Sequence, residues 1–223
     1  MNSWGALMLD QVDGLFDVHD PRDEQSTDAR KYTERELLDA LHTKLDAEAK
    51  GNGGHRWIVA EKVRNIAGYA VRRGELRTAD ALAIDTWESK GLEIHGFEVK
   101  CSRSDWLTEL KQPEKSEPFR RFCDRWWLVT SSKDIVKPGE LPAGWGHMAI
   151  APTYVERNVG MDVWLPEWRP VSWSRMRYHA RVPSMTLRRV VQAPKLSDRE
   201  PISREMMATI MRSVAITAER KSA

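Results

Sequence analysis

Two charged residues inside an otherwise apolar strand constrain the fold of this chain more than any other feature. The sequence predicts two strands, over residues 79–87 and 92–101, joined by a tight turn and rich in small, branched and aromatic side chains. Glu98 and Lys100 lie two residues apart on the second strand, so they share one face. If the turn contains an odd number of residues, Asp80 of the first strand lies on that face as well. The pattern then brings two carboxylates and one lysine together.

This combination of side chains suits metal-dependent hydrolysis of a phosphodiester. Two carboxylates supply the hard oxygen ligands that Mg²⁺ or Mn²⁺ prefers, and they leave coordination positions for water and for a substrate phosphate. A bound cation lowers the pKa of an attacking water molecule and neutralises the charge that grows at the phosphorus centre. A neighbouring lysine orients that water or stabilises the developing charge.

A structural ion pair is the competing interpretation, because a Glu-x-Lys pair by itself carries little information. The chain contains five such pairs, and four of them fall in predicted helices or turns, where solvated charges are typical. Only Glu98 and Lys100 lie within an apolar strand, where charges are costly unless they are paired or bind a ligand. The other four pairs are Glu48/Lys50, Glu88/Lys90, Glu109/Lys111 and Glu219/Lys221.

The residues around Asp80, Glu98 and Lys100 resemble the PD-(D/E)XK nuclease superfamily. Asp80, followed by Glu98-Val99-Lys100 at the end of the next strand, is similar to the bipartite motif that gives the superfamily its name. The longer runs TADALAI (78–84), FEVKCSRSDW (97–106) and CDRWWLV (123–129) resemble the MmcB-like DNA-repair branch, over about residues 32–152. Ala79 stands where the name of the motif has a proline.

The resemblance implies an α/β fold with a restriction-endonuclease-like core, in which helices flank a mixed central β-sheet. It also implies a metal-dependent deoxyribonuclease that works in DNA repair, in recombination or in the processing of phage nucleic acid. Asp80 and Glu98 would hold Mg²⁺ or Mn²⁺, and Lys100 would act on the water or on the transition state. DNA is the expected substrate, with RNA as the alternative.

Three glutamates compete for the role of an auxiliary acid. The resemblance implies a catalytic role for Glu34, because the first helix of many such nucleases supplies a glutamate that helps to hold the metal. A capping-box pattern, Thr33 followed by Glu36, predicts the start of that helix and explains acids in its first turn without any metal. Glu61, in a strand predicted over residues 57–63, either faces the same cleft or pairs with an arginine.

Apolar patterns predict the rest of the core. Ser104 is expected to cap a helix that follows the charged strand, and further strands are expected over residues 125–130 and 145–151. A helical connection between two strands predicts that these strands are parallel. A last helix is expected over residues 201–214, with Met206 among the residues that face the core.

Four segments of the chain differ in composition. Residues 1–31 form an acidic arm, 32–152 the nuclease core, 153–191 a basic insertion that is rich in Trp and Arg and contains strands, and 192–223 a C-terminal helix that packs on the core. The arm is expected either to be loosely ordered or to cover a basic groove. Arginines interleaved with aromatic residues in the insertion suit phosphate contact and base stacking, or else packing of the aromatic rings on the core.

Seven arginines are expected to bind nucleic acid, because they lie near the predicted site or within the insertion. Contacts of this kind weaken as the salt concentration rises. The seven are Arg72, Arg73, Arg77, Arg103, Arg175, Arg177 and Arg181.

Composition argues against several other classes of protein. With 41% hydrophobic and 30% charged residues, the chain is typical of folded domains rather than of disordered ones. No apolar run has the length of a membrane span, and no signal-peptide pattern is present. Cys101 and Cys123 are expected to be free thiols in a reducing compartment, so a cytoplasmic protein is predicted. The sequence contains no phosphate loop, nucleophile elbow or zinc-ligand pattern.

Two other classes of function stay open at the level of the sequence. One is a nucleic-acid-binding module that keeps the nuclease fold without turnover, and the other is a protein-binding inhibitory factor. Resemblance of fold does not separate them from an enzyme. The oligomeric state is not determined by the sequence either, and a dimer is compatible with it.

Overall fold

The computed structural model describes residues 31–49, 56–66, 76–159 and 178–222. Residues Tyr32–Ala223 belong to one structural unit, whereas residues 1–30 of the predicted acidic arm lie outside the described residues. Among the helices that are described, none combines the length and the apolar character that crossing a membrane requires.

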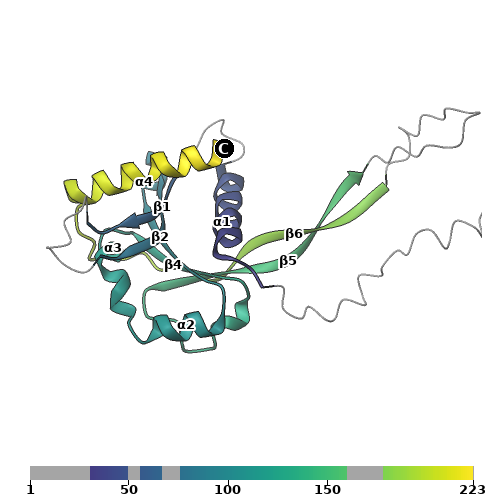
Figure 1. The fold of residues 1–223 in the computed structure, drawn as a ribbon, viewed down its shortest axis with the longest axis horizontal. Helices are drawn as coiled ribbons and strands as arrows, with labels where there is room; N and C mark the ends of the chain where they lie inside the picture. The colour runs from purple at the N-terminus through teal and green to yellow at the C-terminus, as the bar shows by residue number, and fades with distance from the viewer. Residues whose placement is uncertain (1–30, 50–55, 67–75, 160–177, 223) are drawn as a thin grey trace, which may run out of the picture. The chain divides into compact units, whose positions relative to one another are not determined.

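Six strands of the described chain form a single mixed sheet (Figure 1). β1, β2 and β3 are antiparallel neighbours, β3, β4 and β5 are parallel, and β6 returns antiparallel to β5. The predicted α/β class, with a mixed central sheet between helices, is thereby confirmed. In spatial order the strands are β1 (Trp57–Arg64), β2 (Thr78–Asp85), β3 (Ile94–Lys100), β4 (Arg125–Thr130), β5 (Trp145–Val159) and β6 (Tyr178–Val191).

Helices cover both faces of the sheet, which is why its central strands are apolar on both sides. Leu37 and Leu41 of α1 pack with Phe97 on one face. On the other face, Trp106 of α2 and Phe119 of α3 pack in a second cluster, which also includes the start of α4. The helices are α1 (Glu34–Ala49), α2 (Arg103–Leu110), α3 (Glu117–Arg120) and α4 (Arg204–Ser222), and a 3₁₀ turn, η3 (Pro113–Ser116), precedes α3.

The predicted capping box at the start of α1 is confirmed. The backbone N–H of Thr33 donates to Glu36 Oε2 over 2.9 Å, and the N–H of Glu36 donates to Thr33 Oγ1 over 3.2 Å. The parallel pairing of β3 with β4 across a helical connection is confirmed as well.

Two glycines let tryptophans lie flat against neighbouring strands. A Cβ at Gly96 would lie 2.1 Å from the ring of Trp126, and one at Gly146 would lie 2.5 Å from the ring of Trp127. Trp126 and Trp127 belong to the two different core clusters, so their rings fill opposite faces of the sheet. Because Gly96 has no side chain, the ring of Trp126 packs directly against β3, two residues from Glu98.

Three predicted boundaries are wrong. Ser102, not Ser104, caps α2, since its Oγ accepts a hydrogen bond of 3.2 Å from the N–H of Asp105. α4 continues past the predicted end at residue 214 to Ser222, because Ala, Glu, Arg and Lys, which favour helices, follow that position.

The third error concerns β5, which continues past the predicted end at residue 151 to Val159. β4 pairs with β5 only as far as Ala149, so the remainder of β5 pairs with β6 alone and forms a two-stranded ribbon (Figure 1). Pro152 is tolerated there, because each strand of such a ribbon has an open edge that needs no backbone donor. The predicted start of the insertion at residue 153 thus falls inside a strand of the sheet.

Candidate functional site

Asp80 lies where β2 and β3 separate. Backbone pairing between these strands ends at Ala81 and Phe97. Beyond that point the side chain of Asp80 takes over the role of a backbone carbonyl, because its Oδ2 accepts a hydrogen bond of 2.8 Å from the N–H of Val99. The carboxylate is thereby held at the fork between the two strands, and its side chain is only 14% exposed.

Lys62 of β1 holds the other oxygen of this carboxylate. Residues on either side of Lys62 pair with β2, but Lys62 itself has a φ of 51°, in the left-handed region that side-chain-bearing residues rarely adopt. From this irregular position the ammonium donates to Asp80 Oδ1 over 2.8 Å and also pairs with Glu34 of α1. One ammonium group thus bridges the acid of β2 and the acid of the first helix.

Glu98, Lys100 and Glu109 form a second group of charges. The ammonium of Lys100 pairs with Glu98 on the same strand and lies 3.1 Å from Oε2 of Glu109 on α2. All three side chains are 15% exposed or less. The predicted proximity of Glu98 and Lys100 is therefore present, with an additional carboxylate that the sequence interpretation placed in solvent.

Burial and neighbouring charges shift the protonation equilibria in this region. The pKa of Glu98 is raised to about 7, first because burial disfavours the carboxylate and then because the negative charge of Asp80 acts on it. Burial alone would lower the pKa of Lys100, but the charge and hydrogen bond of Glu98, together with Glu109, outweigh it and raise that pKa. At neutral pH Lys100 is therefore a fixed cation beside a carboxyl group that titrates.

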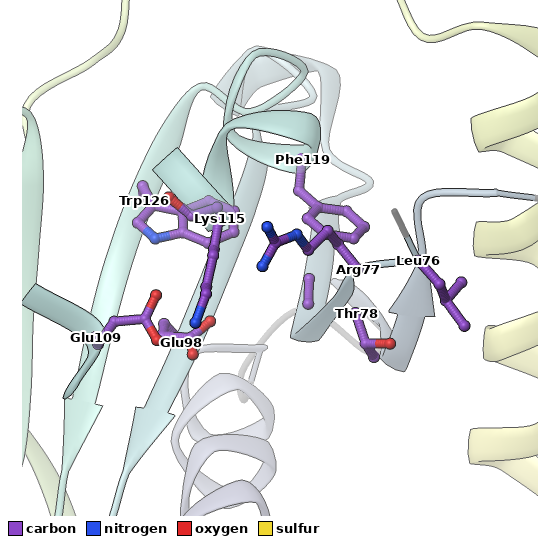
Figure 2. A pocket seen from close by; sticks show the side chains of 10 residues that line it. Leu76, Arg77, Thr78, Glu98, Glu109, Lys115, Phe119 and Trp126 are labelled. Carbon is purple, nitrogen blue, oxygen red and sulfur yellow. The ribbon is translucent and has the colours of Figure 1, made fainter. Parts of the chain in front are cut away.

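A cavity of about 210 Å³ opens beside Glu98. Figure 2 shows Glu98 and Glu109 on one side of it, with the side chain of Lys115 reaching down toward them and Arg77 across from Lys115. The buried ring of Trp126 forms part of its wall. The cavity thus adjoins the charged group and contains basic as well as acidic side chains.

These residues fit a hard divalent cation. Asp80 and Glu98 supply carboxylate oxygens, and a cation would favour the ionised form of Glu98, whose pKa is raised by burial and then by the charge of Asp80. Within the described residues, no group of three or more His, Cys, Asp or Glu side chains is arranged to hold a metal ion. A cation here would therefore take its remaining ligands from water or substrate, as Mg²⁺ does when only one or two carboxylates bind it.

The three glutamates considered as auxiliary acids lie in different environments. Glu34 pairs with Lys62, which brings it to the same ammonium as Asp80. Glu36 is engaged in the capping box. Glu61 is buried and pairs with Arg35, Arg220 and His42, so it is a structural anchor. Of the three, only Glu34 adjoins the predicted metal ligands.

Three of the seven arginines predicted to bind nucleic acid lie within the described residues, each in a different part of the fold. Arg77 lines the cavity, and its backbone N–H donates to Asn65 Oδ1. Arg103 pairs with Glu140 and donates to the carbonyl of Ile135 over 2.6 Å, so it stabilises the loop that contains these two residues. Arg181 lies on β6 opposite Glu156. The remaining four, Arg72, Arg73, Arg175 and Arg177, lie outside the described residues.

Sequence reasoning missed three charged residues of the site. Lys62 and Lys115 have no motif around them, and their positions depend on a strand irregularity and on a 3₁₀ turn. Glu109 belongs to one of the Glu-x-Lys pairs that were interpreted as solvated, and this interpretation is wrong because its side chain is 12% exposed. Helical spacing offers a signal for Glu109, since it lies three residues after the buried Trp106 and so on a neighbouring part of the inward face of α2.

Comparisons with known proteins add no relative from which a role could be transferred. The chain matches no protein-family model, no curated protein and no solved structure.

Proposed function

We propose that this protein is a metal-dependent nuclease of the PD-(D/E)XK type that hydrolyses phosphodiester bonds in DNA. The observation that supports this most is the placement of Asp80 at the fork of β2 and β3, with Glu98 and Lys100 at the end of β3. Two carboxylates and a lysine at strand ends, beside a cavity with basic side chains, are the parts that such a reaction needs.

The order of elements supports a restriction-endonuclease-like core. A helix, three antiparallel strands, and a helical crossover to a parallel strand follow one another from α1 to β4. This order is the one that the resemblance of the sequence implies, and it places the charged residues on two neighbouring central strands.

Asp80 and Glu98 are the residues that would hold Mg²⁺ or Mn²⁺, with Glu34 adjacent to them. When bound, the cation would lower the pKa of a water molecule and offset negative charge at the phosphate. Lys62 pairs with Asp80 and Glu34, so it would have to release them when a cation binds. Its side chain is 49% exposed and has room to turn toward solvent or toward a phosphate.

Lys100 has a role that its protonation state defines. Because Glu98 and Glu109 raise its pKa, it stays charged at neutral pH and does not serve as a general base. A fixed ammonium instead stabilises charge that develops on the phosphate oxygens, or orients the attacking water through a hydrogen bond. Glu109 positions this ammonium through its contact of 3.1 Å.

The first prediction tests this assignment by cleavage of single-stranded, duplex, branched and nicked DNA, and of RNA, with Mn²⁺. Asp80→Asn and Lys100→Ala should each cut at least about a hundredfold more slowly, the scale expected for loss of one strong electrostatic stabiliser. Both variants should still bind DNA, because the lost interactions act mainly on charge in the transition state. Glu88→Gln is a matched control, since it removes an exposed carboxylate from the turn at the opposite end of β2 and β3.

Cleavage at the wild-type rate by Asp80→Asn would show that this site does not carry the activity. If the wild type cuts none of the substrates and Mn²⁺ leaves its melting temperature unchanged, the protein is a binding module and the proposal fails.

A further inference from the structure

The cavity beside Glu98 contains a basic side chain, Lys115, that has no ion-pair partner among the described residues. Lys115 projects into it from η3 and is half-buried. Within the described residues its ammonium forms no hydrogen bond and no ion pair within 4.0 Å, although Figure 2 shows it directed toward the carboxylates of Glu98 and Glu109. An ammonium removed from much of its water without a partner is costly unless a ligand supplies the missing anion.

The two carboxylates toward which Lys115 is directed already have a cation (Figure 2). Glu98 and Glu109 are both paired with Lys100, which does not line the cavity. Lys115 therefore adds a positive charge to the lining beside carboxylates that already pair with another lysine.

The size of the cavity restricts the ligand. At about 210 Å³ it is smaller than the pockets of roughly 300–1,000 Å³ that enclose whole small-molecule ligands. A phosphate group fits such a space, whereas a complete nucleotide would have to leave its sugar and base outside.

We infer that this cavity is a phosphate-binding subsite and that Lys115 is the residue that holds the phosphate. The inference rests on the proposed function, under which the phosphate belongs to the nucleic-acid strand that is being cut, next to the reacting bond. Lys115 is then a substrate-binding residue that sets the position of the strand over Glu98, and Arg77 assists from the opposite wall.

Binding of inorganic phosphate in the presence of EDTA tests the subsite without any catalysis. Titration followed by calorimetry, at constant ionic strength, should give a dissociation constant at least tenfold weaker for Lys115→Ala than for wild type, the loss expected for one charge-assisted hydrogen bond. Lys115→Arg should retain most of the binding. Lys111→Ala is the matched control, because Lys111 is exposed at the end of α2 and does not line the cavity.

Equal phosphate binding by wild type and Lys115→Ala, or no binding by either protein, would overturn the inference. These results are independent of cleavage: if phosphate binds through Lys115 but no nucleic acid is cut with Mn²⁺, the subsite stands and the nuclease proposal fails. If cleavage is normal and Lys115→Ala has neither weaker phosphate binding nor a higher KM for DNA, the nuclease proposal stands and the subsite fails.

Oligonucleotide binding in EDTA distinguishes the two sources of the phosphate. For a phosphate within the chain, Lys115→Ala weakens binding of circular single-stranded DNA as much as that of linear DNA. For a terminal phosphate, the substitution weakens only the binding of 5′- or 3′-phosphorylated linear strands.

Discussion

Glu98 is the residue at which the proposed function and the stability of the fold conflict most directly. Its raised pKa means that the folded protein holds this proton more tightly than the unfolded chain does. Stability must then fall with rising pH between the ordinary carboxyl pKa, about 4.3, and the raised value of about 7, because the unfolded state binds fewer protons in that window. Above this pH range the carboxylate of Glu98 is ionised and buried, and it destabilises the fold at every higher pH.

The second prediction follows from this fall in stability as the pH rises. Without metal, Glu98→Gln should melt at a temperature close to that of wild type near pH 5 and above it at pH 7.5, because the amide never acquires the buried charge. Thermal unfolding in EDTA across this pH range measures the difference. Mn²⁺ should stabilise wild type and have little effect on the variant. A constant difference between the two proteins at all pH values would contradict the assignment of the raised pKa to Glu98.

At the scale of elements, α4 closes the outer edge of the sheet. Edge strands expose unpaired backbone groups, but the N–H of Glu61 on β1 donates to Thr217 Oγ1 of α4 over 3.0 Å. The carboxylate of Glu61 accepts from Arg220 of α4 and from Arg35 and His42 of α1. One buried glutamate therefore joins β1, the first helix and the last helix.

The third prediction concerns this glutamate. Burial alone would raise the pKa of Glu61, but its hydrogen bonds with Arg35, His42 and Arg220 lower it well below the usual range. Glu61→Gln should lose about 2–3 kcal/mol of stability at pH 7, below the range for fully buried ion pairs because both arginines are 38% exposed.

Urea unfolding at several pH values measures this loss. The stabilisation by Glu61 is fully present above the ordinary carboxyl pKa of about 4.3 and is lost as the pH falls toward the lowered pKa. The unfolding free energies of wild type and Glu61→Gln should therefore begin to approach each other only below about pH 4. Glu219→Gln, an exposed neighbour of Arg220 on α4, should behave like wild type. If the difference in unfolding free energy between wild type and Glu61→Gln persists at acid pH, its cause is packing rather than charge.

Comparison of particular elements shows what the sequence can predict. β4 is predicted to the residue, and β1, β2 and β3 to within two residues at each end, because short strands buried on both faces have compact apolar patterns. Asp80, Glu98 and Lys100 could be proposed as neighbours because alternate side chains of a strand point to the same face. Lys62 was not predicted, because its contacts depend on a left-handed backbone position. Glu109 was not predicted either, because its contact with Lys100 depends on the rotation of α2 about its own axis.

At the scale of the whole molecule, one of the arginines predicted to contact nucleic acid lies on the β5–β6 ribbon. Arg175, Arg177 and Arg181 belong to the basic segment that ends in β6, although only Arg181 lies within a described strand. Positive charge placed away from the reaction centre binds the backbone without regard to sequence.

The fourth prediction is that alanine at Arg175, Arg177 and Arg181 together weakens DNA binding and flattens its dependence on salt. The slope of log K against log salt should fall by about 0.9 for each lost contact with duplex DNA. Fluorescence anisotropy at several salt concentrations measures it. Alanine at Arg188 and Arg189, which are exposed on the part of β6 that borders the central sheet, is the control. An unchanged slope in the triple variant would assign the segment a structural role.

The contact between Glu61 and α4 also has a consequence for synthesis. A ribosome adds roughly 5–20 residues per second, so α1 and the first three strands emerge well before Thr217 and Arg220. Until α4 docks, the backbone N–H of Glu61 on β1 lacks its acceptor, the hydroxyl of Thr217. The open edge strand next to β2 is therefore covered only after nearly the whole chain has been synthesised.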